Sequence, residues 1–231
     1  MRLLVSIPKA RYSSRHSWQS IEGIESVGIP EANPDTPIKT IHFPEPFSEK
    51  NYEKQCKKLQ NCPGLAHLIY HPMINDRNCE AFSSILEQNY LHTRLSFEVM
   101  DNDKNESYPD NKILGSAVKR LKKKDSTSGI GICLDTCHIL PSQELFHFWD
   151  SYLDVITHIH ISDYYPSGNH YIKHLPPTAG KFPWESFFRW MKDRYHGYYV
   201  LELHGHNFKD LSVCRTVQNY IDLVCTIYNR C

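Results

Sequence analysis

The stretch GICLDTCH, residues 131–138, decides the fold: it is an apolar run that ends in Asp135 and places His138 three residues later. A short apolar run beside a glycine is typical of a strand buried in a parallel sheet. We therefore expect a strand over 130–135, with Asp135 at its carboxyl end and His138 in the loop above it. A carboxylate and an imidazole at this spacing indicate a metal site. The alternative is that Asp135 caps a helix and His138 is an ordinary loop residue.

Composition limits the classes of protein that the chain can belong to. A chain of 231 residues suits one large domain, residues 1–231. The 26 Lys and Arg residues balance the 26 Asp and Glu residues, so no overall charge draws the chain to nucleic acid or to an anionic membrane. Cysteines without a paired CxxC framework, and the lack of any apolar run of about 18 residues, predict a cytoplasmic protein without a membrane segment. The oligomeric state stays open.

The rest of the chain repeats the pattern of an apolar strand followed by a helical stripe. Strands are expected over 2–7, 21–27, 38–43, 65–71, 91–98, 130–135, 155–162 and 198–203. Helical spacing of apolar residues occurs over 76–90, 113–121, 141–152, 183–195 and 209–228, and the charged segment 48–59 is a further helix candidate. Residues 8–20 lack such a stripe. This order predicts an α/β fold, a (β/α)8 TIM barrel with the first helices reduced or missing.

Six of the predicted strands end on residue types that bind metals. In strand order these residues are His42, His71, Glu98, Asp135, His160 and Glu202. A barrel brings such strand ends to one rim, where loops can add His138 and His174. One buried polar residue is more often a hydrogen-bonded core group. Six in succession, with three carboxylates that repel one another, instead indicate bound cations. A mixed His and carboxylate set suits Zn, Mn or Fe, and its size indicates more than one ion.

Other polar residues have simpler interpretations. His158 faces the same way as His160 but one layer lower, and is expected to be a packed imidazole or a partner behind the ligands. His204 and His206 are left outside the ligand set, and Cys133 and Cys137 are interpreted as packing. The basic run over 119–124 is interpreted as the solvated end of a helix rather than a nucleic-acid patch.

A family resemblance rests on the segment 131–138, the strand ends at His42 and His71, the segment 160–163 and Glu202. Together these parts resemble the endonuclease IV family, AP endonuclease family 2, within the xylose isomerase-like TIM barrel superfamily. The similarity spans roughly 38–205. It implies that three zinc ions share one cluster. By match, the first ion is held by His42, His71 and Glu98, the second by Glu98, Asp135, His160 and Glu202, and the third by His138 and His174. The predicted catalytic residues are Glu98, Glu202 and His138.

The sequence departs from that family at three places. Ile172 stands where the family has an Asp ligand of the third ion, so we expect two or three Zn2+ ions, with Mn2+ as an alternative. Glu45 stands where the nucleases place an aromatic side chain on DNA, and a carboxylate there would face phosphate unfavourably. The loop over 28–37 has no Arg to enter a groove. The sequence therefore retains most of the metal ligands of that family, while the features that bind DNA are weakened.

Three functions remain open from the sequence. The first is a divalent-metal-dependent phosphoester hydrolase of the endonuclease IV type. The second is a metal-dependent sugar or sugar phosphate isomerase or epimerase, in which Glu98 and Glu202 move a proton. The third is a barrel that binds metal or sugar without turnover. The expected partner is accordingly a small phosphorylated or sugar-like substrate, or damaged DNA.

Overall fold

The computed structural model describes most of the chain, with gaps in several connections. The described residues are 1–8, 18–29, 37–48, 50–51, 54–55, 67–72, 94–100, 111–124, 129–138, 149–168, 170–203 and 211–231. The helix predicted over 76–90 lies outside these residues, as do most of 48–59 and 141–152 and the histidines at 204 and 206.

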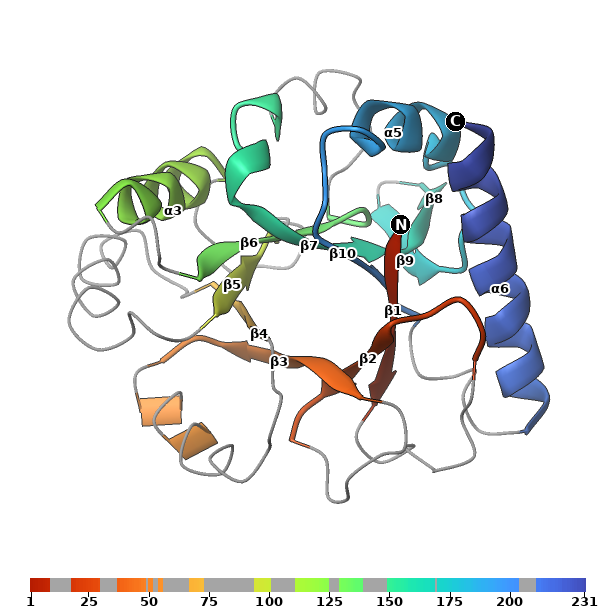
Figure 1. The fold of residues 1–231 in the computed structure, drawn as a ribbon, viewed down its shortest axis with the longest axis horizontal. Coiled ribbons are helices and arrows are strands. Elements are labelled where there is room, and N and C mark those ends of the chain that lie inside the picture. The colour runs from red at the N-terminus through yellow and green to blue at the C-terminus, as the bar shows by residue number, and fades with distance from the viewer. Residues whose placement is uncertain are drawn as a thin grey trace.

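Eight parallel strands close into a barrel (Figure 1), as the sequence predicts. Around the barrel the strand order is β1, β10, β7, β6, β5, β4, β3 and β2. The bounds of these strands, in chain order, are β1 Arg2–Pro8, β2 Gly23–Val27, β3 Ile38–Pro46, β4 His67–His71, β5 Leu95–Glu98, β6 Ile130–Asp135, β7 Ile156–Ile161 and β10 Tyr198–Leu201. Because all strands run in the same direction, their carboxyl ends share one rim.

Strand β6 illustrates why the sequence folds in this way. All six of its residues are buried, as expected of a strand with a filled barrel on one side and helices on the other. Ile132 and Leu134 belong to the same hydrophobic core as Val118 of the neighbouring helix. Gly131 is required here because a Cβ atom would lie 2.3 Å from Cγ2 of Thr157 on β7. The close approach of β6 and β7 brings Asp135 into register with His160.

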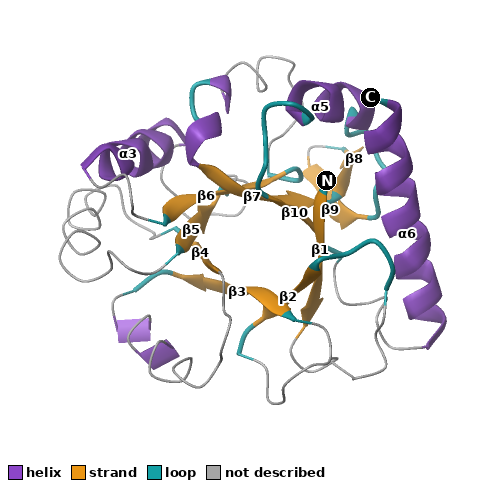
Figure 2. Cartoon of the chain, viewed as in Figure 1, coloured by secondary structure: helices purple, strands orange, loops and turns teal. Residues whose placement is uncertain are grey.

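Helices lie on the outside of the barrel (Figure 2). The helices whose bounds the structure gives are α3 Asn111–Lys124, α5 Trp184–Met191 and α6 Leu211–Arg230. The stripe predicted for α5 is confirmed, since Trp184, Phe187, Phe188 and Met191 are all buried. None of the described helices is both long enough and apolar enough to cross a membrane.

The structure corrects several predicted boundaries. Strand β3 does not stop before Pro44 but continues to Pro46, through an irregularity in its pairing with β4. The region after β7, predicted as a long loop, instead contains an antiparallel pair, β8 Asp163–Ser167 and β9 His170–Leu175. Before β7, residues Leu153–Val155 form a short 3-10 helix.

Candidate metal centre

The structure places all eight predicted ligands around the carboxyl rim of the barrel, in three groups that share Glu98 and Asp135. Five of them are almost fully buried: His42, Glu98, Asp135, His160 and Glu202. The side chains of His71, His138 and His174 are 16%, 10% and 14% exposed. The carboxylates therefore lie in the dry part of the cluster, and these three imidazoles form its side toward solvent.

The first group of ligand atoms centres on one oxygen of Glu98. Its Oε2 atom lies 3.0 Å from Nε2 of His42 and 3.1 Å from Nε2 of His71. These residues come from three consecutive strands, β3, β4 and β5, whose carboxyl ends are adjacent. Two imidazole nitrogens and a carboxylate oxygen that converge in this way form a typical partial set of ligands for zinc.

The second group uses the other oxygen of Glu98. Its Oε1 atom lies 2.9 Å from Nδ1 of His160, and Oε2 of Glu202 lies 3.2 Å from the same nitrogen. Asp135 offers a fourth ligand atom to this group. Each oxygen of Glu98 therefore faces a different set of partners, so Glu98 could contribute a ligand atom to both groups.

In the third group the carboxylate comes from a residue that the sequence did not predict for this group. Oδ2 of Asp135 lies 3.7 Å from Nε2 of His138 and 4.0 Å from Nδ1 of His174. Ile172, at the position of the missing family ligand, is 48% exposed. The third group thus gains its carboxylate from Asp135, which it shares with the second group.

Local hydrogen bonds hold Asp135 in one orientation. Its Oδ1 atom accepts hydrogen bonds from the main-chain N–H of Cys137 at 2.6 Å and from Oγ of Ser162 at 3.2 Å. Its Oδ2 atom is buried and accepts no hydrogen bond from any residue that the structure describes. Such an unsatisfied buried oxygen is costly, and a cation among the ligands would satisfy it.

The charges of the cluster favour a bound cation. Burial raises the pKa of Glu98, but His42 and His160 outweigh this effect and hold that pKa well below its ordinary value. Burial lowers the pKa of His160, yet the acidic groups around it, led by Cys133 and Glu25, raise that pKa well above its ordinary value. Burial raises the pKa of Asp135, which His138 and His174 offset only in part. Crowded buried carboxylates with this preference for positive partners fit divalent ions.

Asp163 follows β7 but is not part of this cluster. Its Oδ1 atom accepts hydrogen bonds from the main-chain N–H groups of Tyr164 and Phe182, at 2.8 and 2.9 Å. Its Oδ2 atom accepts one from Nε1 of Trp184 at 3.0 Å. Asp163 therefore ties the β8–β9 pair to the start of α5, and so fixes the frame that carries His174.

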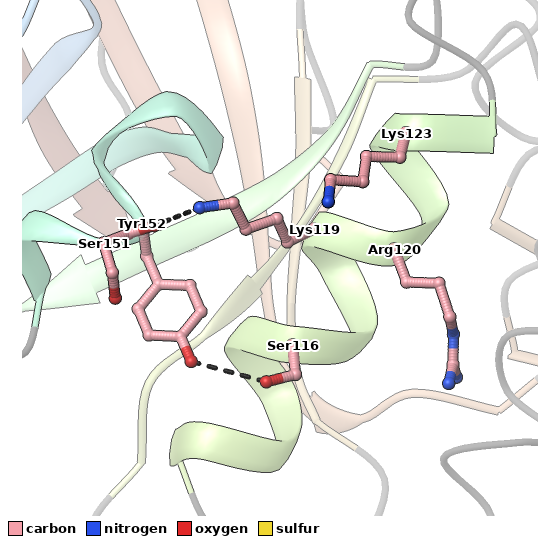
Figure 3. A pocket seen from close by; sticks show the side chains of 6 residues that line it. All are labelled: Ser116, Lys119, Arg120, Lys123, Ser151 and Tyr152. Atoms are coloured by element: carbon pink, nitrogen blue, oxygen red, sulfur yellow. Dashed lines mark hydrogen bonds between the residues drawn. The ribbon is translucent and has the colours of Figure 1, made fainter.

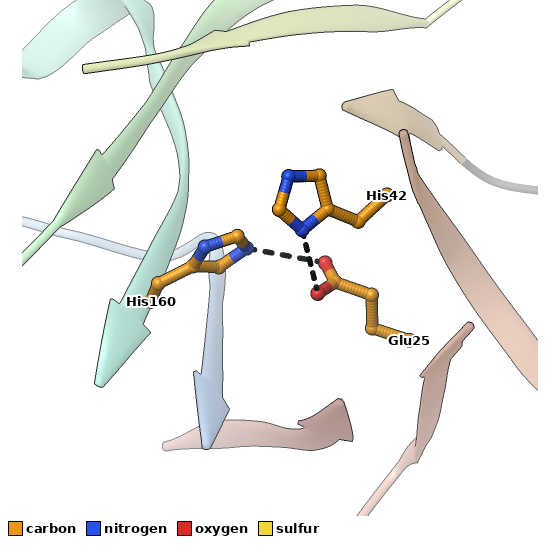
Figure 4. Close-up of side chains that lie close together, drawn as sticks. All are labelled: Glu25, His42 and His160. Carbon is orange, nitrogen blue, oxygen red and sulfur yellow. Dashed lines mark hydrogen bonds and ion pairs between the residues drawn. The ribbon is translucent and has the colours of Figure 1, made fainter. Parts of the chain in front are cut away.

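The cluster contains one buried carboxylate that sequence reasoning missed. Glu25 lies on β2, is fully buried, and faces His42 and His160 (Figure 4). Its Oε2 atom lies 3.3 Å from Nε2 of His160. The available signal was a charged residue in the middle of a short apolar strand, where the period of two points the side chain into the barrel.

The inner histidine His158 is a packed imidazole, one of the two interpretations expected for it. Its ring lies 4.5 Å from that of His67, centroid to centroid. Ser96 and Thr157 link the two rings through hydrogen bonds: His67 Nε2 lies 2.7 Å from Ser96 Oγ, and His158 Nδ1 lies 3.0 Å from Thr157 Oγ1. Ser96 and Thr157 are themselves in hydrogen-bond contact. This polar layer lies below the cluster.

A basic hollow of about 340 Å³ lies beside helix α3 (Figure 3). Its lining residues are Ser116, Lys119, Arg120, Lys123, Ser151 and Tyr152. Lys119 pairs with Asp154 at 3.7 Å and donates a hydrogen bond to the carbonyl of Ser151. The end of α3 and Tyr152 precede the amino ends of β6 and β7, so the hollow lies toward the opposite end of the barrel. The basic run is thus a helix surface remote from the cluster.

A family model for xylose isomerase-like TIM barrels matches residues 45–221, more than half of the chain. The chain belongs to this family. The match covers five of the eight barrel strands in full, β4 to β7 and β10, and every predicted ligand except His42. A search of curated proteins finds no match to the chain.

Solved structures of the same fold include proteins that act on sugars. The 3-keto-D-glucoside 4-epimerase YcjR from E. coli is 15% identical, with a TM-score of 0.59 over 98% of this chain and 99% of that one. The TTHB071 protein from Thermus thermophilus, soaked with ZnCl2, is 14% identical, with a TM-score of 0.63 over 100% and 99%. A sugar phosphate isomerase/epimerase from Parabacteroides distasonis is 14% identical, with a TM-score of 0.59 over 96% and 93%. At these identities the likeness concerns the fold alone.

Proposed function

We propose that this xylose isomerase-like barrel is a divalent-metal-dependent phosphoester hydrolase whose cluster holds two or three ions, zinc being the first choice. The observation that carries the proposal is the position of Glu98, one of whose oxygens faces His42 and His71 while the other faces His160. An isomerase with one ion needs no bridging carboxylate and no first group. A hydrolase that uses neighbouring ions needs both.

The ligands would be divided as the three groups are. His42, His71 and Glu98 would hold one ion, and Glu98, Asp135, His160 and Glu202 a second. Asp135, His138 and His174 would hold the third. Zinc ions in such a cluster activate water as a nucleophile and stabilise charge on the oxygens of a phosphate ester.

The residues of the chain also determine how a substrate approaches. Glu98, Asp135 and His160 are buried and keep water from the inner side of the cluster. The partly exposed imidazoles of His71, His138 and His174 belong to the first and third groups, so a phosphate ester that approaches from solvent meets both groups. Glu202 reaches toward both of these groups: its Oε1 atom lies 3.8 Å from Nδ1 of His42, and its Oε2 atom lies 3.7 Å from Nδ1 of His174.

The second candidate is a sugar or sugar phosphate isomerase or epimerase. Glu98, Asp135, His160 and Glu202 by themselves form a complete four-ligand group, and the names of two similar structures contain an epimerase activity. In this case one ion would orient a hydroxy-ketone, and Glu98 and Glu202 would transfer the proton.

The test is metal content measured together with turnover. The purified chain is stripped with a chelator, reloaded with Zn2+ or Mn2+, dialysed and analysed by mass spectrometry for metal per chain. The same samples are assayed on an aryl phosphodiester, a panel of sugar phosphates and a panel of ketoses. Two or more zinc ions per chain with zinc-dependent ester hydrolysis support the proposal. One ion per chain with interconversion of ketoses would replace it with the isomerase.

A further inference from the structure

Glu25 is placed behind two of the proposed ligands rather than among them. It lies within β2, is 0% exposed, and accepts a hydrogen bond from Oγ1 of Thr40 at 3.1 Å through its Oε2 atom. The same oxygen lies 3.3 Å from Nε2 of His160. The other oxygen, Oε1, lies 3.9 Å from Nδ1 of His42 (Figure 4).

The nitrogens that face Glu25 are not the ones that face Glu98. His160 presents Nδ1 to Glu98 and Glu202, and Nε2 to Glu25. His42 presents Nε2 to Glu98, while its Nδ1 lies between Glu25 at 3.9 Å and Oε1 of Glu202 at 3.8 Å. Each ring therefore lies between Glu98, which faces one of its nitrogens, and Glu25, which faces the other.

A neutral imidazole carries one N–H donor and one lone pair, and only the nitrogen with the lone pair can bind a metal. An ionised carboxylate is only an acceptor, so it favours the proton on the nitrogen that it faces. Glu25 would keep the proton of His160 on Nε2 and leave Nδ1 as the ligand atom. At His42 it would favour the proton on Nδ1, with the lone pair on Nε2.

We propose that Glu25 is a positioning residue that fixes the ring orientation and tautomer of His160 and His42, and so joins the first and second metal groups without binding an ion itself. The inference rests on the metal cluster proposed above. Direct ligation by Glu25 is the less favourable arrangement, because an ion at Glu25 would use the second nitrogen of both rings and turn each imidazole into a bridge.

The variant Glu25→Gln tests the inference, since it keeps the size of the side chain and removes its charge. Glu22→Gln is the matched control, because Glu22 lies just before β2 and is exposed, where it pairs with Arg2. Zinc affinity is measured by competition with a chromophoric chelator, and saturated stoichiometry by mass spectrometry. The protonated nitrogen of His160 is read by long-range 1H–15N NMR of the zinc-loaded protein. The visible spectrum of Co2+-loaded protein reports the ligand field.

Positioning predicts that Glu25→Gln lowers zinc affinity by about 10- to 100-fold, alters the cobalt spectrum, and leaves the saturated number of ions unchanged. The wild type should show the proton of His160 on Nε2, and Glu22→Gln should match the wild type in every measurement. Affinity within twofold of the wild type with an unchanged spectrum would overturn the proposal. A saturated stoichiometry lower by one ion would also overturn it, because Glu25 would then be a ligand.

Two arrangements of the experiment keep the result interpretable. If Glu25→Gln does not fold, Thr40→Val is used instead, because it removes the hydroxyl that holds Oε2 of Glu25. This variant should change the zinc affinity and the cobalt spectrum in the same direction as Glu25→Gln, by a smaller amount. A cobalt spectrum identical to that of the wild type would contradict positioning. The hydrolase proposal fails on a different result, namely that the wild type binds several ions but cleaves no phosphate ester. In that case the effect of Glu25 on affinity and tautomer still stands.

Discussion

The sulfur of Cys137 accepts a hydrogen bond at 3.0 Å from the main-chain N–H of His174, which lies 37 residues later. His174 has a φ of 55°, in the left-handed region that a residue other than glycine rarely adopts. Such a conformation costs about 1–3 kcal/mol and persists only where its surroundings hold it. Cys137 also contacts Oγ of Ser162 at 2.9 Å. A cysteine that the sequence indicated only as packing thus holds the backbone of a proposed ligand.

Replacement of Cys137 by Ala should therefore weaken the third group. Without the sulfur acceptor, His174 can relax from its left-handed conformation, and the affinity for the most weakly held ion should fall by about 10-fold. The measurement is zinc retained per chain during titration with a chelator. Cys137→Ser, which keeps an acceptor, should lose less, and Cys225→Ala on α6 should behave as the wild type. Equal zinc retention in Cys137→Ala and the wild type would refute this role.

Substitution of Asp135 by Asn tests the shared carboxylate. Asn keeps an oxygen for the N–H of Cys137, so the barrel should stay folded, as judged by circular dichroism. The loss of the charge near the second and third groups should remove at least one ion and reduce turnover by about 100-fold or more. Asp222→Asn, on the exposed side of α6, is the control. A full metal content in Asp135→Asn would show that the central assignment is wrong.

His71 distinguishes the two enzyme hypotheses. In a cluster of several ions, His71→Ala should lower the saturated metal content by about one ion per chain, since the first group would keep only His42 and Glu98. In a one-ion isomerase the content should stay the same. His170→Ala, an exposed histidine on β9, controls for nonspecific zinc binding. An unchanged metal count with unchanged turnover would favour the isomerase.

The buried layer below the cluster predicts a loss of stability in acid. Burial, together with Arg94, lowers the pKa of His67 to about 3. In the unfolded chain His67 binds a proton near pH 6.5, whereas in the folded protein it stays neutral until the pH is much lower. The contribution of His67 to the free energy of unfolding is therefore complete above pH 6.5 and is lost as the pH falls toward 3. The limiting slope is about 1.4 kcal/mol per pH unit.

Urea unfolding of the metal-free protein between pH 6.5 and 4.5 measures this slope. His67→Gln removes the titrating group and should flatten the dependence relative to the wild type, whereas His196→Gln, at an exposed position, should not. The comparison between variants cancels the contribution of histidines remote from His67, but not that of His158, whose pKa is lowered by burial and also by His67. Parallel curves for His67→Gln and the wild type would contradict the prediction.

Much of the barrel could be predicted because its strands are short apolar runs that end in polar residues. The segment 131–138 contains both signals. Because a closed parallel barrel brings its strand ends to one rim, the predicted ligands were also expected to meet there. The β8–β9 pair was missed because it is a partly exposed extension, with Tyr165 and Ile172 toward solvent and Pro166 within a strand. Neither an apolar run nor a uniform alternation marks it.

Glu25 escaped prediction for a different reason. The predicted ligands lie at strand ends, whereas Glu25 is in register with Thr40, two residues before His42 on the neighbouring strand. A glutamate side chain is long enough to reach from this lower layer to the rings above. The sharing of Asp135 by two groups was also beyond the sequence, since it depends on the direction of Oδ2, which the hydrogen bonds of Oδ1 determine.

The last prediction is that incision of DNA at abasic sites will be weak compared with turnover of a small phosphorylated or sugar-like substrate. A nuclease of this kind bends the duplex and extrudes a nucleotide, which costs several kcal/mol that basic and wedge-shaped side chains must offset. The balanced charge of the chain supplies little counterion release. The basic hollow beside α3 lies away from the rim, while the side chain of Glu45 and residues 30–36 lie outside the described part of the chain. A small substrate needs no such deformation.

Zinc-loaded protein is assayed on a duplex with one abasic site and on small phosphate esters and ketoses, at low and moderate salt, with Asp135→Asn to exclude a contaminating nuclease. Efficient, zinc-dependent incision at moderate salt that Asp135→Asn abolishes would identify a repair endonuclease that needs neither the missing aromatic side chain nor the missing arginine.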